Sequence, residues 1–151
     1  MRRFALPVFA LSAALAAPAP AAVASTYGTA EEAAGLAKEL IAIIDAGGLS
    51  AGLSAVHDPS GPFQTTGMGV HIFDSSVIIA DSRDPDLESV SYAGVADLDG
   101  QDFWDTMVAA ANTDQNTVVR WYDYDDPSVE YTFNCHSEWQ TPGEVMVWIC
   151  R

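Results

Sequence analysis

The sequence predicts an α+β fold: an antiparallel sheet of about five strands with a long N-terminal helix packed on one face. Residues 29–48 have the periodicity of an amphipathic helix, and the pattern changes to strand-like alternation from Gly67 onward. Three more strand-like segments close the chain. The expected order is therefore helix, helix, two strands, loop, helix and three strands.

The first 24 residues have the features of a cleaved secretory signal. Two arginines near the start are followed by an apolar run and by the small-residue cleavage site Ala22-Val23-Ala24. The apolar run is shorter than the ~20 residues that cross a bilayer. We expect removal of residues 1–24, with a retained amphipathic anchor as the alternative. Residues 25–151 would then form one exported domain, periplasmic or secreted.

The charge of the chain excludes two classes of partner. The net charge is −15, and all 21 acidic residues lie within residues 25–151. Such a surface repels the phosphate backbone of nucleic acids and the anionic surfaces of membranes. No second apolar stretch approaches membrane-spanning length. We therefore expect no nucleic-acid binding and no membrane insertion of the mature chain.

The N-terminal helix has a clear start and end. Thr29 and Glu32 form a capping box, and Gly47-Gly48 provides a stop. Residues 49–57 are expected to form a short second helix, which ends before Asp58-Pro59-Ser60-Gly61-Pro62. The apolar face of the first helix consists of Ala33, Leu36, Ala37, Leu40, Ile41 and Ile44.

The rest of the chain is expected to form the sheet and a third helix. Apolar residues alternate from Gly67, and Asp74-Ser75-Ser76 turns the chain into a second strand, Val77–Asp81. The long acidic loop Ser82–Leu98 follows, and loops of this length in small domains are often functional. Asp99 is expected to cap the third helix. The last strands are expected at residues 117–124, 129–136 and 144–150.

The two cysteines of this exported chain are expected to form one disulfide. If a hairpin turn is centred on Pro142-Gly143, Cys135 lies directly opposite Cys150. Opposed residues of antiparallel strands have Cα atoms about 4.5–5.5 Å apart, which suits a disulfide. Pro-Gly favours a type II turn, so a longer loop is the alternative. This register places Tyr131, Phe133, Cys135 and Trp139 on one face with Met146, Trp148 and Cys150.

Several short motifs have a simpler explanation than catalysis or metal binding. The G-x-S-x-G match at residues 48–52 follows a helix in a small chain, whereas a nucleophile elbow follows a strand of a large sheet. Asp97, Asp99 and Asp102 form a fragment of a calcium loop without its bidentate Glu. A turn with a helix cap is our interpretation, and calcium binding is the alternative. His71 is expected to be a packed strand residue. We expect no enzyme, no metal and no cofactor.

Five segments share their pattern with one protein family. In addition, Tyr131 and Trp148 fall where that family has a Tyr and an aromatic residue in its last strands. In these segments the chain resembles the single Cache domain of bacterial extracytoplasmic sensors. The family commonly has a Lys shortly before this Tyr, and residues 127–130 contain none. The matching segments are residues 58–63, 70–74, 80–85, 97–103 and 122–127.

The resemblance implies a PAS-like sheet with a pocket for a small molecule. We expect the pocket on the sheet face opposite the N-terminal helix, under the loop of residues 82–98. Its ligand would be a small polar molecule, that is, a zwitterion, a neutral molecule or a short acid, and its partner a membrane sensor protein. The alternatives are an interaction or structural domain without a small ligand and, for Arg120, an internal salt bridge. The candidate ligand-binding residues are Arg83, Tyr92, Arg120, Tyr122 and Tyr131.

Overall fold

The computed structural model describes residues 27–151, and the predicted signal of residues 1–24 lies outside this part. Five antiparallel strands form one sheet in the order β2-β1-β5-β4-β3, which confirms the predicted α+β fold. No helix in the described part combines the length and hydrophobicity that crossing a bilayer requires. The elements are α1 (Ala30–Gly47), α2 (Leu49–Val56), α3 (Pro62–Thr65), β1 (Gly69–Asp74), β2 (Val77–Asp81), η1 (Pro85–Leu87), α4 (Phe103–Thr113), β3 (Thr117–Tyr122), β4 (Glu130–Thr141) and β5 (Val145–Cys150).

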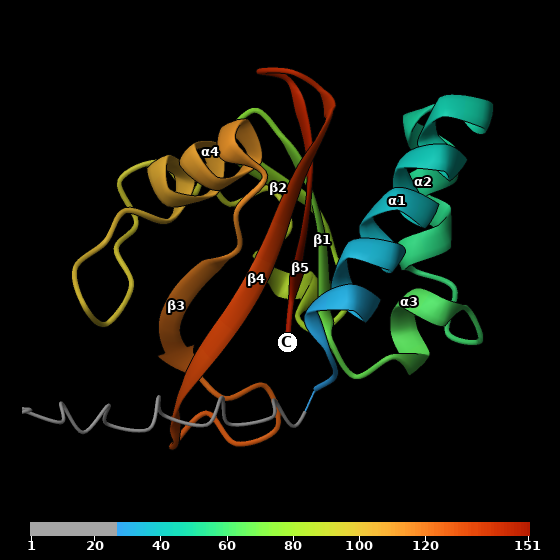
Figure 1. Ribbon diagram of the computed structural model, residues 1–151. Coiled ribbons are helices and arrows are strands. Elements are labelled where there is room, and N and C mark those ends of the chain that lie inside the picture. The colour runs from blue at the N-terminus through green and yellow to red at the C-terminus, as the bar shows by residue number, and fades with distance from the viewer. Residues whose placement is uncertain (1–26) are drawn as a thin grey trace, which may run out of the picture.

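The helices lie on opposite faces of the sheet. Helices α1, α2 and α3 cover one face, whereas α4 and the loop before it cover the other (Figure 1). The predicted capping box starts α1: the Thr29 hydroxyl accepts from the Glu32 N–H, and the Glu32 carboxylate accepts from the Thr29 N–H. Each face therefore has its own core. The core under α1 includes Ala37, Leu40, Ile44, Val56, Val70, Ile72, Val147 and Ile149.

The β4–β5 hairpin confirms the predicted register and disulfide. Cys135 pairs with Cys150, their Cα atoms are 4.1 Å apart, and their sulfur atoms are bonded. The register shifts near the turn, between Trp139 and Thr141, and β4 continues to Thr141, beyond its predicted end at residue 136. The predicted aromatic face of the hairpin belongs to the core opposite α1.

Three further features differ from the prediction. The cap of α4 is Asp102, whose carboxylate accepts from the Asp105 N–H at 2.9 Å, and not Asp99. Strand β3 ends at Tyr122 because the chain turns there around the Asp123 carboxylate, which accepts from two backbone N–H groups. The short helix α3 forms from a Pro-containing segment that we expected only to end α2.

Candidate functional site

A cavity of about 280 Å³ lies on the sheet face opposite α1. Residues of all five strands line it, together with the segments after β2 and β3 and the start of α4. Its position is the one that the sequence led us to expect for a pocket. The charged or ionisable side chains in its wall include His71, Asp81, Arg83, Asp84 and Asp123. The aromatic residues in its wall are Tyr92, Phe103, Trp121, Tyr122, Tyr124, Phe133 and Trp148.

Gly69 makes room for two polar side chains at one end of the cavity. A Cβ at this position would collide with the Tyr124 hydroxyl and would lie 2.7 Å from the His71 ring. Both of these residues line the cavity. The absence of a side chain at Gly69 therefore allows the phenol and the imidazole to pack against the backbone of β1.

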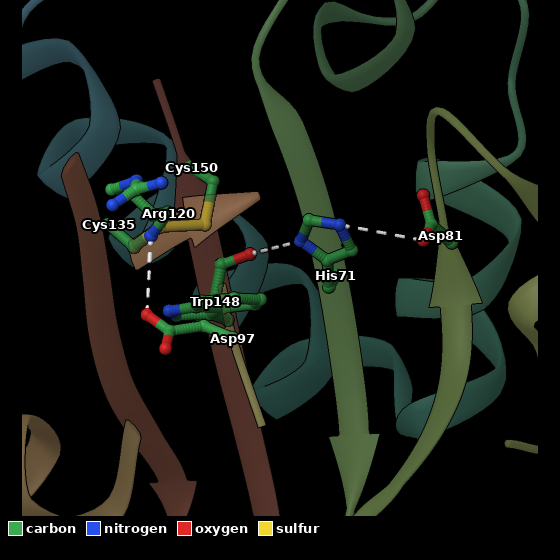
Figure 2. Close-up of a disulfide and its surroundings, with 7 residues drawn as sticks. All are labelled: His71, Asp81, Asp97, Arg120, Cys135, Trp148 and Cys150. Atoms are coloured by element: carbon green, nitrogen blue, oxygen red, sulfur yellow. Dashed lines mark hydrogen bonds and ion pairs between the residues drawn. A yellow bond between two sulfur atoms is a disulfide. The ribbon is translucent and has the colours of Figure 1, made fainter. Parts of the chain in front are cut away.

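His71 and Asp81 meet because they are paired residues of β1 and β2. The His71 Nδ1 lies 3.1 Å from the Trp148 carbonyl oxygen, which can only accept, so Nδ1 carries the proton. The other ring nitrogen, Nε2, faces the Asp81 carboxylate at 3.5 Å (Figure 2). The second Asp81 oxygen accepts from the backbone N–H groups of Arg83 and Asp84 at 2.8 and 2.9 Å. Asp81 is only 2% exposed, so a buried carboxylate with one oxygen bonded to two backbone N–H groups lies in the cavity wall.

Backbone bonds between its loop and the start of β2 hold Tyr92 in the cavity wall. The Tyr92 N–H donates to the Ser76 carbonyl, and Ser91 forms a bridge with Val77 at the edge of β2. The ring then packs edge-on against Phe73 and Phe103. Burial, followed by the negative charges of Asp81 and Asp84, raises the pKa of Tyr92 to about 12.

Arg83 joins two loops at the side of the cavity. Its guanidinium group lies 2.6 Å from the Asp125 carboxylate and 5.3 Å from the centre of the Tyr124 ring. Burial and then the charge of Asp81 raise the pKa of Tyr124 well above its usual value. The positive charge of Arg83 is therefore already paired within the protein.

The structure brings Arg83, Tyr92 and Tyr122 to the cavity but not Arg120 or Tyr131. Arg120 lies on β3 between Val119 and Trp121, which do line the cavity. Its guanidinium forms ion pairs with Asp99 at 2.6 Å and with Glu130 at 2.7 Å. Arg120 therefore has the internal salt bridge that we expected from the sequence as the alternative to ligand binding.

Tyr131 packs against the rings of Tyr27 and Phe133. The sequence suggested that Arg120 and Tyr122 share a face because they are two residues apart. Tyr122 is the last residue of its strand, where that alternation ends. We therefore leave Arg120 and Tyr131 out of the proposed site.

The aspartate cluster near α4 forms a turn that closes the edge of β3. The Asp97 carboxylate accepts from the N–H groups of Asp99, Gln101 and Arg120, the last at 3.3 Å (Figure 2). The Leu98 N–H donates to the Arg120 carbonyl. Within residues 27–151 no group of three His, Cys, Asp or Glu residues has an arrangement that could hold a metal ion.

We expect the Asp97 turn to stabilise the folded protein at neutral pH and to lose this effect as the pH falls into the acid range. Burial would raise the pKa of Asp97, but its N–H donors hold that pKa below the usual value of about 3.9. A group with a lowered folded-state pKa stabilises the protein above its unfolded pKa, and the effect is lost as the pH falls through the folded value. Asp97→Asn should therefore lower Tm at neutral pH, and the difference from wild type should shrink below pH ~4. A Tm difference that is constant with pH would contradict this.

Several cavity residues were not identified from the sequence. Asp81 and His71 are paired only because the register of β1 and β2 shifts between Ile72 and Phe73, and the sequence gives no sign of this shift. The sequence has no signal that distinguishes Asp123 from its acidic neighbours Asp125 and Asp126, so its place in the cavity wall was not predictable. Trp148, which the predicted register places on the aromatic face of the hairpin, lies in the core and also lines the cavity.

No protein-family model and no curated protein matches this chain. Solved structures do match it, over 80% of its length. One is a methyl-accepting chemotaxis protein from Vibrio parahaemolyticus, with 12% identity, a TM-score of 0.60 and 86% of that chain covered. Another is a Cache chemosensory domain described as recognising carboxylic acids, with 19% identity, a TM-score of 0.59 and 86% covered.

A third match is the periplasmic sensor domain of a chemotaxis protein, with 16% identity, a TM-score of 0.54 and 88% of that chain covered. The chain has the Cache fold. At these identities the likeness establishes the architecture of the Cache domain and not its ligand.

Proposed function

We propose that this Cache-fold domain is exported and binds a small polar molecule in the cavity between the sheet and the loop after β2. The cavity itself carries the proposal: about 280 Å³, lined by aromatic rings with a few charged groups. Small-molecule sites are concave and mostly apolar, with a few polar groups that orient the ligand, and typically measure about 300–1,000 Å³. The volume here lies just below that range, so the ligand has few heavy atoms.

The binding function is favoured over a purely structural or interaction domain. Such a domain would have filled this space with its Trp and Tyr side chains. Instead, groups from β1, β2, β3 and two loops converge on an open space. The disulfide of β4 and β5 suits an oxidising, extracytoplasmic compartment. There the domain would pass its ligand-bound state to a membrane sensor protein.

A thermal-shift screen of small acids, amines and amino acids on the exported protein tests the proposal. A ligand that binds only the native state at 100 times its Kd stabilises it by about 2.7 kcal/mol. We expect Tyr122→Ala to weaken binding of the selected compound several-fold, because Tyr122 lines the cavity. Val118→Ala is the matched control, since both residues are exposed and lie on β3, but Val118 is not in the cavity wall. Equal binding by the two variants would place the ligand elsewhere.

A further inference from the structure

The charges in the cavity wall do not favour an anion. Three carboxylates, those of Asp81, Asp84 and Asp123, face one guanidinium, that of Arg83. The Arg83 guanidinium is paired with Asp125 at 2.6 Å. An incoming acid would have to displace this carboxylate and would meet three others. Both steps oppose anion binding.

The carboxylates act on the interior of the cavity and not only on its rim. Asp81 and Asp84 raise the pKa of Tyr92, after the larger effect of burial. Burial would raise the pKa of Asp123, but N–H groups, the Tyr27 hydroxyl and Arg83 hold it below its usual value. Asp123 therefore stays ionised at neutral pH, and the cavity keeps its negative charge.

The rest of the wall suits a positively charged nitrogen. Aromatic rings from Tyr92, Trp121, Tyr122 and Tyr124 surround the cavity. A cation over the face of such a ring is attracted by its quadrupole, and desolvation strengthens this attraction. Trp148 also lines the cavity: it is 4% exposed, and its indole N–H has no partner among the described residues. A ligand with an oxygen acceptor can supply one.

We propose that the ligand of this cavity is a small organic cation, an ammonium compound that also carries an oxygen acceptor. This inference rests on the proposed binding function and narrows its ligand class. The ammonium group lies among the aromatic rings, with Asp84 and Asp123 as its counter-charges. The acidic surface of the whole domain, with its net charge of −15 for the full chain, speeds the approach of a cation.

Choline and 3,3-dimethyl-1-butanol form the decisive pair of probes, because the alcohol replaces the charged nitrogen of choline with carbon and keeps its shape. Propionate serves as the anionic probe. Each probe is titrated into the exported protein, and binding is measured by calorimetry and by the NMR signals of the tryptophan indole N–H groups. Choline should bind about tenfold more tightly than its neutral isostere. Propionate should not bind in the cavity.

Asp84→Asn and Asp86→Asn are the matched variants. Both remove one negative charge from the same short helix region, but only Asp84 lines the cavity. Asn can still cap η1 in place of Asp84, so the fold should be kept. We expect Asp84→Asn to weaken choline binding roughly fivefold and Asp86→Asn to change it far less.

The outcomes separate the two proposals. Propionate binding that is lost in Tyr122→Ala, with no binding of choline, overturns the cation assignment and leaves the ligand-binding function intact. Equal affinity for choline and its isostere also overturns the cation assignment. Absence of binding in the cavity by every compound of the screen and by all three probes overturns the binding function as well.

Discussion

Replacing both Cys135 and Cys150 with Ser is expected to lower the free energy of unfolding by about 3 kcal/mol. The two residues are 15 positions apart and form the described disulfide. In the chain-entropy model a closed loop of this length restricts the unfolded chain and so stabilises the folded state by this amount. The bond also joins β4 and β5 at the end of the chain, beside the cavity, whose wall includes Cys150.

Chemical denaturation and calorimetry of the exported protein measure this loss, which corresponds to a fall in Tm of roughly 10 °C for a domain of this size. Wild-type protein unfolded in a reducing buffer is the control, and it should match the double variant. The fold should persist, because both strands keep their neighbours in the sheet. Two free thiols in the native exported protein, or an unchanged Tm in the variant, would contradict the prediction.

The sheet was predictable because its local signals agree with its long-range pairing. Cys135 and Cys150 determine a hairpin register that alternation also supports, and the structure keeps this register up to Trp139. The capping box of Thr29 and Glu32 is equally local. Such features depend on residues only a few positions apart or directly opposed, so the sequence shows them without knowledge of the rest of the fold.

The cap of α4 could not be chosen from the sequence. Asp97, Asp99 and Asp102 all have side chains able to cap a helix. The choice depends on a distant partner: Asp97 and Leu98 bond to the backbone of Arg120, and this contact fixes the turn. The Asp99 carboxylate forms an ion pair with the Arg120 guanidinium, and Asp102 is the residue that caps α4.

The composition of the cavity wall was only partly predictable for a related reason. Arg83 and Tyr92 reach it through the predicted loop, but the loop after β3 contributes Asp123 and Tyr124 as well. That loop is positioned by Arg83 and by Tyr27, whose hydroxyl donates to Asp123 at 2.9 Å. Contacts between segments about 40 to 100 residues apart leave no periodic trace in the sequence.

Phe73→Ala is expected to cause the largest loss of stability, about 3–5 kcal/mol. Phe73 is fully buried in the core opposite α1, where its ring contacts Tyr92, Trp104 and Trp148. Truncation removes these aromatic contacts and leaves a cavity that the sheet cannot close. Phe73→Leu keeps most of the volume and should cost far less, which provides a folded variant for binding measurements.

A variant in the core under α1 shows whether the effect of the Phe73 variants on binding is specific to the cavity. Leu40→Ala, in the core under α1, should cost about 2–5 kcal/mol because Leu40 is also fully buried. Phe73, unlike Leu40, packs against Tyr92 in the cavity wall. The Phe73 variants should therefore weaken binding of the compound selected by the thermal-shift screen, whereas Leu40→Ala should leave its affinity unchanged in the folded protein. Denaturation measures the first effect, and calorimetric titration well below Tm measures the second. If Leu40→Ala weakened binding as much as Phe73→Leu, affinity would follow global stability, and the cavity beside Phe73 would not be the binding site.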